Sequence, residues 1–302
     1  MSDVHGQLTR CLSLLKSAQL VSVASRESTS KELALWERVR WKPRDGKRHL
    51  LVILGDHIGK HGEDPAALIL LFQKLEREAL AQGSRLVVTL GNHEAEFLAD
   101  PNDEAEPELI AGATRYAGKI RGIHRGEDPN GQEILESELG DELKRNPLGA
   151  VIGKTLWVHS GFFDVPLGDE PAAWVRSLTR LHAGQSYDEL TGDKGAGFAS
   201  ALDRHDWIEK PELRNKMRRT LRSLGLEGVA MGHEPRALGV TGQIALSKDG
   251  AFLKLDAGMN AYHDHGTGRI LSCPTKDFLF KNCVQLDSKG KTSPLAPEKS
   301  TE

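Results

Sequence analysis

The sequence predicts an α/β protein, and three features of the chain support that class. Short aliphatic runs, such as residues 50–54, stop at a glycine, which is typical of strands buried on both faces. Residues 65–82 carry apolar side chains at helical spacing, so a helix is expected to connect two parallel strands. Several strand-like pieces follow between residues 237 and 286, which suggests a second sheet packed on the first. We therefore expect one large domain over 1–286.

Two helices can be placed in the N-terminal part of the chain. Apolar residues from Leu8 to Leu15 recur at helical spacing and predict a first helix. In the second helix, Asp64 stands at the capping position and Pro65 in the first turn, where proline is tolerated. Residues 21–49 between the helix and the next strand are polar and predict a long connection that packs over the sheet edge, or else contributes to a substrate rim.

Two insertions and a tail complete the expected organisation. Residues 95–150 contain acidic, helix-like segments interrupted by prolines and predict a helical cap over the sheet. Residues 164–227 predict a second insertion, which ends in a cationic helix whose charge row is more typical of a solvated face than of a binding site. Residues 287–302 are polar and rich in Pro, Lys and Ser, so a disordered tail is expected there.

The composition excludes several functional classes. A net charge of −3 provides no electrostatic basis for binding nucleic acid or a membrane surface. No apolar run approaches the length of a membrane span. The three cysteines, Cys11, Cys273 and Cys283, are widely spaced and suggest neither a metal finger nor a disulfide framework. This spacing favours a reducing compartment, so we expect a cytoplasmic protein.

The N-terminus departs from the pattern of the rest of the chain. Asp3 and His5 resemble the end of a strand, but no apolar run precedes them. We interpret Met1 as an internal methionine or a truncation point, and an upstream segment could then also carry a targeting signal. The alternative is a sheet that tolerates the loss of this strand.

Five polar motifs recur along the chain, and four of them stand where apolar runs end. They are Asp3-Val4-His5-Gly6, Gly55-Asp56-His57-Ile58-Gly59-Lys60, Gly91-Asn92-His93-Glu94, His159-Ser160-Gly161 and Gly232-His233-Glu234. Ligands in open α/β sheets bind outside the carboxyl ends of the strands, so these side chains are expected to meet at one edge. Each motif alone is weak, because a single histidine at a strand end is usually a hydrogen-bonded structural residue. Five in order predict a metal site, or a degenerate site that has lost its metal.

The ligand types narrow the choice of metal. Carboxylate, amide oxygen and imidazole, without thiolate, suit manganese, iron or zinc.

In their order, these motifs resemble those of the calcineurin-like metallophosphoesterases and, among them, the phosphoprotein-phosphatase branch. Over residues 2–262, details such as the Trp-containing connection and Leu255-Asp256-Ala257-Gly258-Met259 are most similar to the bacterial Shewanella-like protein phosphatases. The resemblance implies a four-layer α/β/β/α sandwich of two mixed sheets. It also implies a dinuclear phosphomonoesterase in which a hydroxide that bridges two metal ions, most simply manganese, attacks phosphorus.

The resemblance also implies roles for individual residues. Asp3 and His5 would bind one metal, and Asp56 would bridge both. The second metal would be bound by Asn92, His159 and His233, and Asn92 would also contact the substrate phosphate.

His93 would not be a ligand. It would donate a proton to the leaving oxygen or stabilise charge there, and the structural alternative is that it orients Asn92.

Four departures from the family pattern affect the prediction. Ser2 and Ser160 each replace a glycine, and Gly59 replaces an aspartate that would support the catalytic histidine. Lys60 replaces an arginine, so a point charge would contact phosphate in place of a bidentate fork. Lys60 could equally be a solvated loop residue.

Other residues are weaker candidates for the site. Arg204 lies where a second phosphate-binding arginine is expected, although a surface salt bridge explains it equally well. His57, His61 and His265 are candidates for the pocket rim, but exposed or hydrogen-bonded roles are more typical of such histidines. For Asp256 a structural turn is the favoured role.

We expect a protein phosphatase acting on phosphoserine, phosphothreonine or phosphotyrosine, without a nucleic-acid or membrane partner. One alternative is an ApaH-like hydrolase of dinucleoside polyphosphates, RNA caps or polyphosphate, since Lys in the second motif also occurs there. The other is an inactive metal-binding interaction module, suggested by Gly59 and Lys60.

Overall fold

The computed structural model describes residues 1–25, 33–59, 61–126, 128–161, 202, 206–259, 266–274 and 280–299. The helices are α1 (Leu8–Ser17), α2 (Pro65–Ala81), α3 (Asn92–Ala99), α4 (Pro101–Glu104), α5 (Pro107–Arg115), α6 (Gly131–Leu135), α7 (Glu138–Arg145) and α11 (Pro211–Ser223). The strands are β1 (Val21–Val23), β2 (Val39–Trp41), β3 (Leu50–Leu54), β4 (Arg85–Thr89), β5 (Gly149–Ile152), β6 (Thr155–Val158), β7 (Gly228–Met231), β8 (Ala245–Leu246), β9 (Phe252–Lys254), β10 (Ile270–Ser272), β11 (Val284–Leu286), β12 (Thr292–Pro294) and β13 (Ala296–Pro297). Within these residues, no helix is both long and apolar enough to cross a membrane.

Two sheets carry the functional residues. In the first, β3 and β4 are parallel, and a parallel bridge between Ser2 and Leu54 adds the N-terminus to the free side of β3. The second sheet has the order β13-β8-β9-β7-β6-β5. It is mixed, because β6, β7 and β9 are parallel whereas β5 runs antiparallel to β6 and β8 runs antiparallel to β9.

Side chains on alternate faces of β3 enter two different cores, because successive residues of a strand point to opposite faces. Leu51 and Ile53 pack in the cluster formed with α1 and α2. Val52 and Leu54 pack in a second cluster that includes Trp157 of β6 and therefore lies between the two sheets. The first sheet is thus buried on both faces, as the unbroken apolar run predicts.

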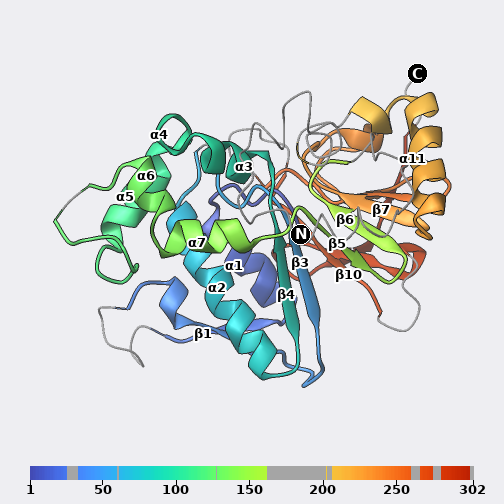
Figure 1. Ribbon diagram of the computed structural model, residues 1–302. Coiled ribbons are helices and arrows are strands. Elements are labelled where there is room, and N and C mark those ends of the chain that lie inside the picture. Colours follow the sequence, from blue (N-terminus) through green and yellow to red (C-terminus); the bar gives the residue numbers. More distant parts are fainter. Residues whose placement is uncertain are drawn as a thin grey trace.

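The second sheet divides its side chains in the same way. Trp157 and Ala230 face the first sheet, whereas their strand neighbours belong to a third cluster that contains Met217 and Leu221 of α11. Figure 1 shows the resulting order, with α1 to α7 on one side of β3 and β4, the second sheet on the other side, and α11 beyond it. The predicted α/β/β/α sandwich is confirmed.

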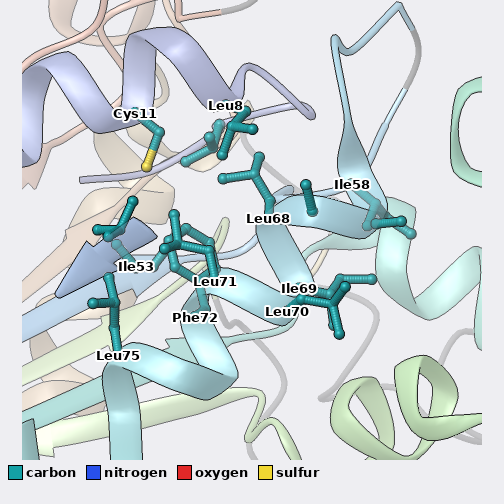
Figure 2. Packing of buried hydrophobic residues seen from close by; sticks show 14 of the residues in the cluster. Leu8, Cys11, Ile53, Ile58, Leu68, Ile69, Leu70, Leu71, Phe72 and Leu75 are labelled. Carbon is teal, nitrogen blue, oxygen red and sulfur yellow. The ribbon is translucent and has the colours of Figure 1, made fainter. Parts of the chain in front are cut away.

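The two predicted N-terminal helices are both present. Helix α2 begins at Pro65, and the side chain of Asp64 accepts a hydrogen bond from the backbone N–H of Ala67 at 3.1 Å, as expected of a cap. Figure 2 shows how Leu68, Leu71 and Phe72 of this helix pack against α1 and β3. Helix α2 is the crossover between the parallel strands β3 and β4.

The connection over residues 21–49 contains structure that its polar sequence does not predict. Strands β1 and β2 form a short antiparallel pair within it. Trp41 of β2 is buried, and its backbone N–H donates to the carboxylate of Glu78 on α2 at 2.7 Å. The connection is therefore fixed to the helical layer through α2.

The predicted helical segments agree with the structure wherever it describes them. Residues 95–150 contain most of α3 and all of α4 to α7. Of residues 164–227, much lies outside the described ranges, but α11 is present and carries the cationic row. Arg214 pairs with Glu298 at 2.6 Å and Arg218 with Asp249, so these two charges already have acidic partners.

The C-terminal strands are more extensive than expected. Strands β8 to β11 fall within the predicted strand-like pieces. In contrast to the expected disordered tail, residues 292–297 form β12, which pairs with β11, and β13, which pairs with β8. The polar composition of this segment is compatible with edge strands, whose hydrogen bonds come from strands distant in sequence.

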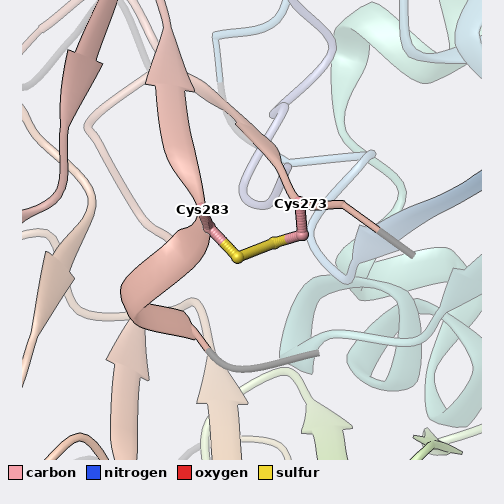
Figure 3. The surroundings of a disulfide bond; sticks show 2 residues. All are labelled: Cys273 and Cys283. Carbon is pink, nitrogen blue, oxygen red and sulfur yellow. A yellow bond between two sulfur atoms is a disulfide. The ribbon is translucent and has the colours of Figure 1, made fainter. Parts of the chain in front are cut away.

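Cys273 and Cys283 form a disulfide (Figure 3). The interpretation that the cysteines form no disulfide was wrong for this pair. The antiparallel register of β10 and β11 pairs Ser272 with Val284. Cys273 directly follows Ser272 and Cys283 directly precedes Val284, so the two cysteines lie opposite each other with their Cα atoms 4.3 Å apart. The cysteine argument for a reducing compartment therefore no longer holds.

Chemical titration can test this disulfide. In denaturant without reductant, we expect one reactive thiol per chain, from Cys11, and three after reduction. Because the bond closes a short loop, replacing both Cys273 and Cys283 by serine should cost about 2–3 kcal/mol of unfolding free energy, measured by urea denaturation. Replacing Cys11 by serine is the thiol-counting control. Three reactive thiols before reduction would contradict the assignment.

Candidate metal centre

The predicted site residues follow the ends of four strands. Asp56 follows β3, Asn92 opens α3 directly after β4, His159 follows β6 and His233 follows β7. β3 and β4 run parallel, as do β6 and β7, so each pair presents its carboxyl ends at one edge. The contacts described next show that the two edges meet.

Asp56 lies at the centre of the site. Its Oδ2 is 3.3 Å from Nε2 of His159 and 3.8 Å from Nε2 of His5. Its Oδ1 accepts a hydrogen bond from the backbone N–H of His93 at 3.3 Å. The carboxylate is buried, so groups from three separate segments of the chain surround a single negative charge.

His159 presents a nitrogen lone pair to other lone pairs. Its Nδ1 is 3.2 Å from the carbonyl oxygen of Leu54, an acceptor, which places the ring proton on Nδ1 in the neutral tautomer. Its Nε2 then faces Asn92 Oδ1 at 3.2 Å, His233 Nδ1 at 3.1 Å and Asp56. A proton on Nε2 could be donated in a hydrogen bond to one of these atoms, whereas a metal cation could be bound by all of them. A histidine whose second nitrogen binds a backbone carbonyl is the usual metal-ligand arrangement.

Among the residues that the structure describes, two groups of side chains offer ligand atoms that lie within 4.8 Å of one another. One group is His5, Asp56 and His93, and the other is Asp56, His159 and His233. Asp56 belongs to both, which is the arrangement that a bridging carboxylate requires. His93 lies among the candidate ligands, although the family resemblance implies that it transfers a proton.

Asp3 is adjacent to these groups rather than inside them. Its Oδ1 accepts a hydrogen bond from the backbone N–H of His233 at 2.9 Å. Its Oδ2 is buried and has no hydrogen-bond partner among the residues that the structure describes. A buried carboxylate oxygen without a partner is costly, so this atom also fits a cation.

The electrostatics of the site favour bound positive charge. Burial raises the pKa of Asp3 well above its usual range, and nearby Asp256 adds to the effect. Burial alone would raise the pKa of Asp56 too, but His159 outweighs it and holds that pKa well below the usual range. Burial would lower the pKa of His159, but Asp56 raises it to about 10. The buried carboxylates of Asp3 and Asp56 therefore differ: Asp56 has His159 as a cationic partner, whereas burial and Asp256 disfavour the charge of Asp3 unless a cation is added.

Several of these side chains are held by a strained backbone. Asp3, His5, Asp56 and His233 have φ angles of 54°, 44°, 46° and 64°, in the left-handed region that residues other than glycine rarely adopt. Such conformations persist only where the surroundings enforce them, and they gather at functional sites.

Glu94 is the residue that enforces the geometry around Asp56. Its fully buried carboxylate accepts backbone hydrogen bonds from Asp56 and Ile58 at 2.8 Å and from Gly91 at 2.7 Å. One side chain therefore joins the loop after β3 to the turn after β4. The signal for Glu94 in the sequence is its spacing from Gly91, which matches the glutamate of a capping box.

Glycines allow the two turns to approach. A β-carbon at Gly91 would lie 2.1 Å from Oδ1 of Asp56, and one at Gly55 would lie 2.6 Å from the backbone of Gly91. At Gly59, where φ is 136°, a β-carbon would lie 2.6 Å from Nδ1 of His5. The glycines of these motifs therefore provide the space in which the ligands converge.

The remaining candidates have different positions. His57 is buried, with Nδ1 3.4 Å from the Glu94 carboxylate, so it does not lie on a pocket rim. His61 is exposed. Asp256 accepts a hydrogen bond from the backbone N–H of Gly258 at 2.8 Å, which is the predicted turn. Lys60, Arg204 and His265 lie outside the described residues.

Comparison with known proteins assigns the family. The sequence profile of the calcineurin-like phosphoesterases matches residues 1–237. The chain belongs to the calcineurin-like phosphoesterase family. It is therefore a metal-dependent phosphoesterase, and the resemblance noted from the motifs is confirmed. No curated protein sequence matches it closely enough to count as a relative.

Solved structures share the fold of this calcineurin-like phosphoesterase. The cold-active protein-tyrosine phosphatase of a psychrophilic Shewanella species is 17% identical, with a TM-score of 0.65, over 98% of this chain and 78% of that one. A single-residue mutant of a cold-active protein tyrosine phosphatase is 18% identical, with the same TM-score and coverage. At these identities the likeness establishes the shared architecture.

Replacing Glu94 tests whether it enforces the site geometry. In Glu94→Gln, the amide can accept at one atom only, and its NH₂ group would face a backbone donor. We expect a loss of about 2–3 kcal/mol in unfolding free energy, measured by urea denaturation, because a buried donor is left unsatisfied. Glu104→Gln, on the exposed surface of α4, is the matched control. Equal stability of the two variants would contradict this role.

Proposed function

We propose that this phosphoesterase hydrolyses phosphomonoesters of proteins, at phosphoserine, phosphothreonine or phosphotyrosine, with two divalent metal ions. The observation that supports it best is the pair of candidate ligand groups that share Asp56. A second support is the fold shared with solved protein tyrosine phosphatases.

The chain's residues fit two ions. We assign Asp3, His5 and Asp56 to one, and Asp56, Asn92, His159 and His233 to the other. When bound, such a pair activates water and stabilises charge on the phosphoryl oxygens. We propose manganese, because the oxygen and imidazole donors and the lack of thiolate suit it; iron and zinc also suit these donors.

The protein's own groups act on the leaving side and on the phosphate. His93 is the second residue of α3 and lies beside Asp56, and its Nδ1 is 3.8 Å from Oε2 of Glu96. We assign His93 to donate a proton to the leaving oxygen. Asn92 is oriented by Glu96, which accepts from its Nδ2 at 3.3 Å, and by His159. Lys60 and Arg204 remain proposed phosphate contacts.

A substrate panel tests the proposal. Manganese-loaded protein should release phosphate from phosphoseryl, phosphothreonyl or phosphotyrosyl peptides faster than it cleaves diadenosine tetraphosphate. Asp56→Asn should lower that rate at least about 100-fold, because metal ions supply several kcal/mol of transition-state stabilisation. Circular dichroism should show that the variant keeps its fold, and elemental analysis should show reduced metal content.

Other outcomes would replace the proposal. Preferential cleavage of diadenosine tetraphosphate would favour the ApaH-like alternative. Bound metal without hydrolysis of any phosphoester would favour an inactive interaction module.

His93 can be tested as proton donor against ligand. His93→Ala should slow hydrolysis of phosphoserine peptides by about 10²–10⁴-fold, because their alkoxide leaving group needs a proton. The loss for p-nitrophenyl phosphate should be much smaller, since its leaving group is stable without one. Metal content should stay that of the unmodified chain. Equal losses on both substrates would indicate that His93 only orients Asn92, and loss of metal would indicate a ligand.

A further inference from the structure

Lys254 is a buried cation that belongs to neither of the two candidate ligand groups. It is the last residue of β9, and its side chain is 0% exposed. Burial lowers the pKa of Lys254 to about 8, and the carboxylates of Asp256, Glu234 and Asp3 oppose this effect. A buried ammonium group is costly unless hydrogen bonds satisfy it. The partners of Lys254 therefore indicate what the charge is used for.

The ammonium group of Lys254 is hydrogen-bonded to a single turn. Its Nζ donates to the carbonyl oxygen of Pro235 at 2.8 Å and to that of Val240 at 2.5 Å. Both residues belong to the segment 232–240, which follows β7 and includes the short helix η3 (Ala237–Gly239). We call this segment the His233 turn, because it carries the candidate ligand His233. One side chain thus joins two separate carbonyls of the turn.

The pairing of β9 with β7 brings Lys254 to this position. In the parallel register of the two strands, Lys254 lies opposite Met231, the last residue of β7. Phe252, two residues earlier on β9, packs in the same cluster as Leu238 and Val240 of the His233 turn. Alternate residues of a strand share a face, so Lys254 points to the same side as Phe252 and reaches over the end of β7.

The His233 turn has a strained backbone that requires such an anchor. His233 and Leu238 have φ angles of 64° and 60°, which residues other than glycine adopt only where the surroundings enforce them. At its start the turn is held by the hydrogen bond from the backbone N–H of His233 to Asp3. The two bonds from Lys254 hold it farther along the chain. With both ends held, Nδ1 of His233 lies 3.1 Å from Nε2 of His159.

We propose that Lys254 is a positioning residue for the second metal ion, because it fixes the His233 turn and so holds His233 beside His159 before the ion binds. A ligand that is already in place spares the ion the free energy of ordering it. Methionine fills a similar space but donates no hydrogen bond, so Lys254→Met would release the turn. The inference rests on the proposed assignment of His233 to a metal ion.

Hydrogen exchange of the metal-free protein tests the anchor itself. The amides of Ala237 and Gly239 donate within the His233 turn, at 3.2 and 3.1 Å. In Lys254→Met these amides should exchange at least about tenfold faster, because the turn opens more easily without the charged donor. Phe252→Leu is the matched control, since it weakens the same core and leaves both bonds of Lys254 intact. Equal exchange in Lys254→Met and the unmodified chain would overturn the proposal.

Metal binding tests the consequence for the site. Equilibrium dialysis against manganese should show two ions per unmodified chain and per Phe252→Leu chain. Lys254→Met should bind the first ion with unchanged affinity and the second at least about tenfold more weakly. An equal loss of the second ion in Phe252→Leu would overturn the proposal, because general loss of core stability would then explain the effect.

A second variant covers the case in which Lys254→Met does not fold. Lys254→Arg keeps the charge and the donors, so retention of both ions supports the proposal. Loss of the second ion with unchanged exchange in the His233 turn overturns it. An unmodified chain that binds fewer than two ions would instead overturn the proposed function, and the exchange rates of the metal-free protein keep that result separate from the role of Lys254.

Discussion

The candidate metal centre depends on one buried carboxylate that belongs to neither of the two candidate ligand groups. Glu94 accepts hydrogen bonds from the backbone of Asp56, Ile58 and Gly91 and so fixes the turn after β3 against the turn after β4. Asp56 can then sit with a left-handed backbone and direct its carboxylate toward His5 and His159. Three charge-assisted hydrogen bonds also satisfy Glu94 itself, which would otherwise be a costly buried charge.

The site also requires that the two sheets keep a fixed position relative to each other. His5, Asp56 and Asn92 come from the layer containing β3 and β4, whereas His159 and His233 come from the second sheet. The core between the sheets, which includes Val52, Trp157 and Phe280, therefore sets the separation of the two ligand groups. Close-packed cores resist small displacements, so the position of Asp56 against His159 is fixed by packing far from the chemistry.

Much of this arrangement could be predicted from the sequence because it depends on local patterns of apolar and polar residues. The runs that form β3, β4, β6 and β7 are largely apolar, and each ends at its polar motif, so the rule for strand ends predicted that the ligands meet at one edge. Features that depend on pairing between distant segments could not be predicted. Strands β12 and β13 are polar, and the disulfide required the register of β10 against β11. The role of Glu94 required knowing which amides surround it.

Gly59 is a departure from the family pattern whose consequence can be seen in the structure. The family resemblance leads one to expect an aspartate there, supporting His93. In this chain the position has a φ of 136° and packs against His5 and His93, with no space for a β-carbon. The carboxylate facing Nδ1 of His93 is instead Glu96, at 3.8 Å and one turn along α3. Glu96 is half-buried and also accepts from Asn92, so one side chain from the helix orients both neighbours. The carboxylate nearest Nδ1 of His93 therefore comes from the helix that carries this histidine, while Gly59 leaves the β3 loop without one at that position.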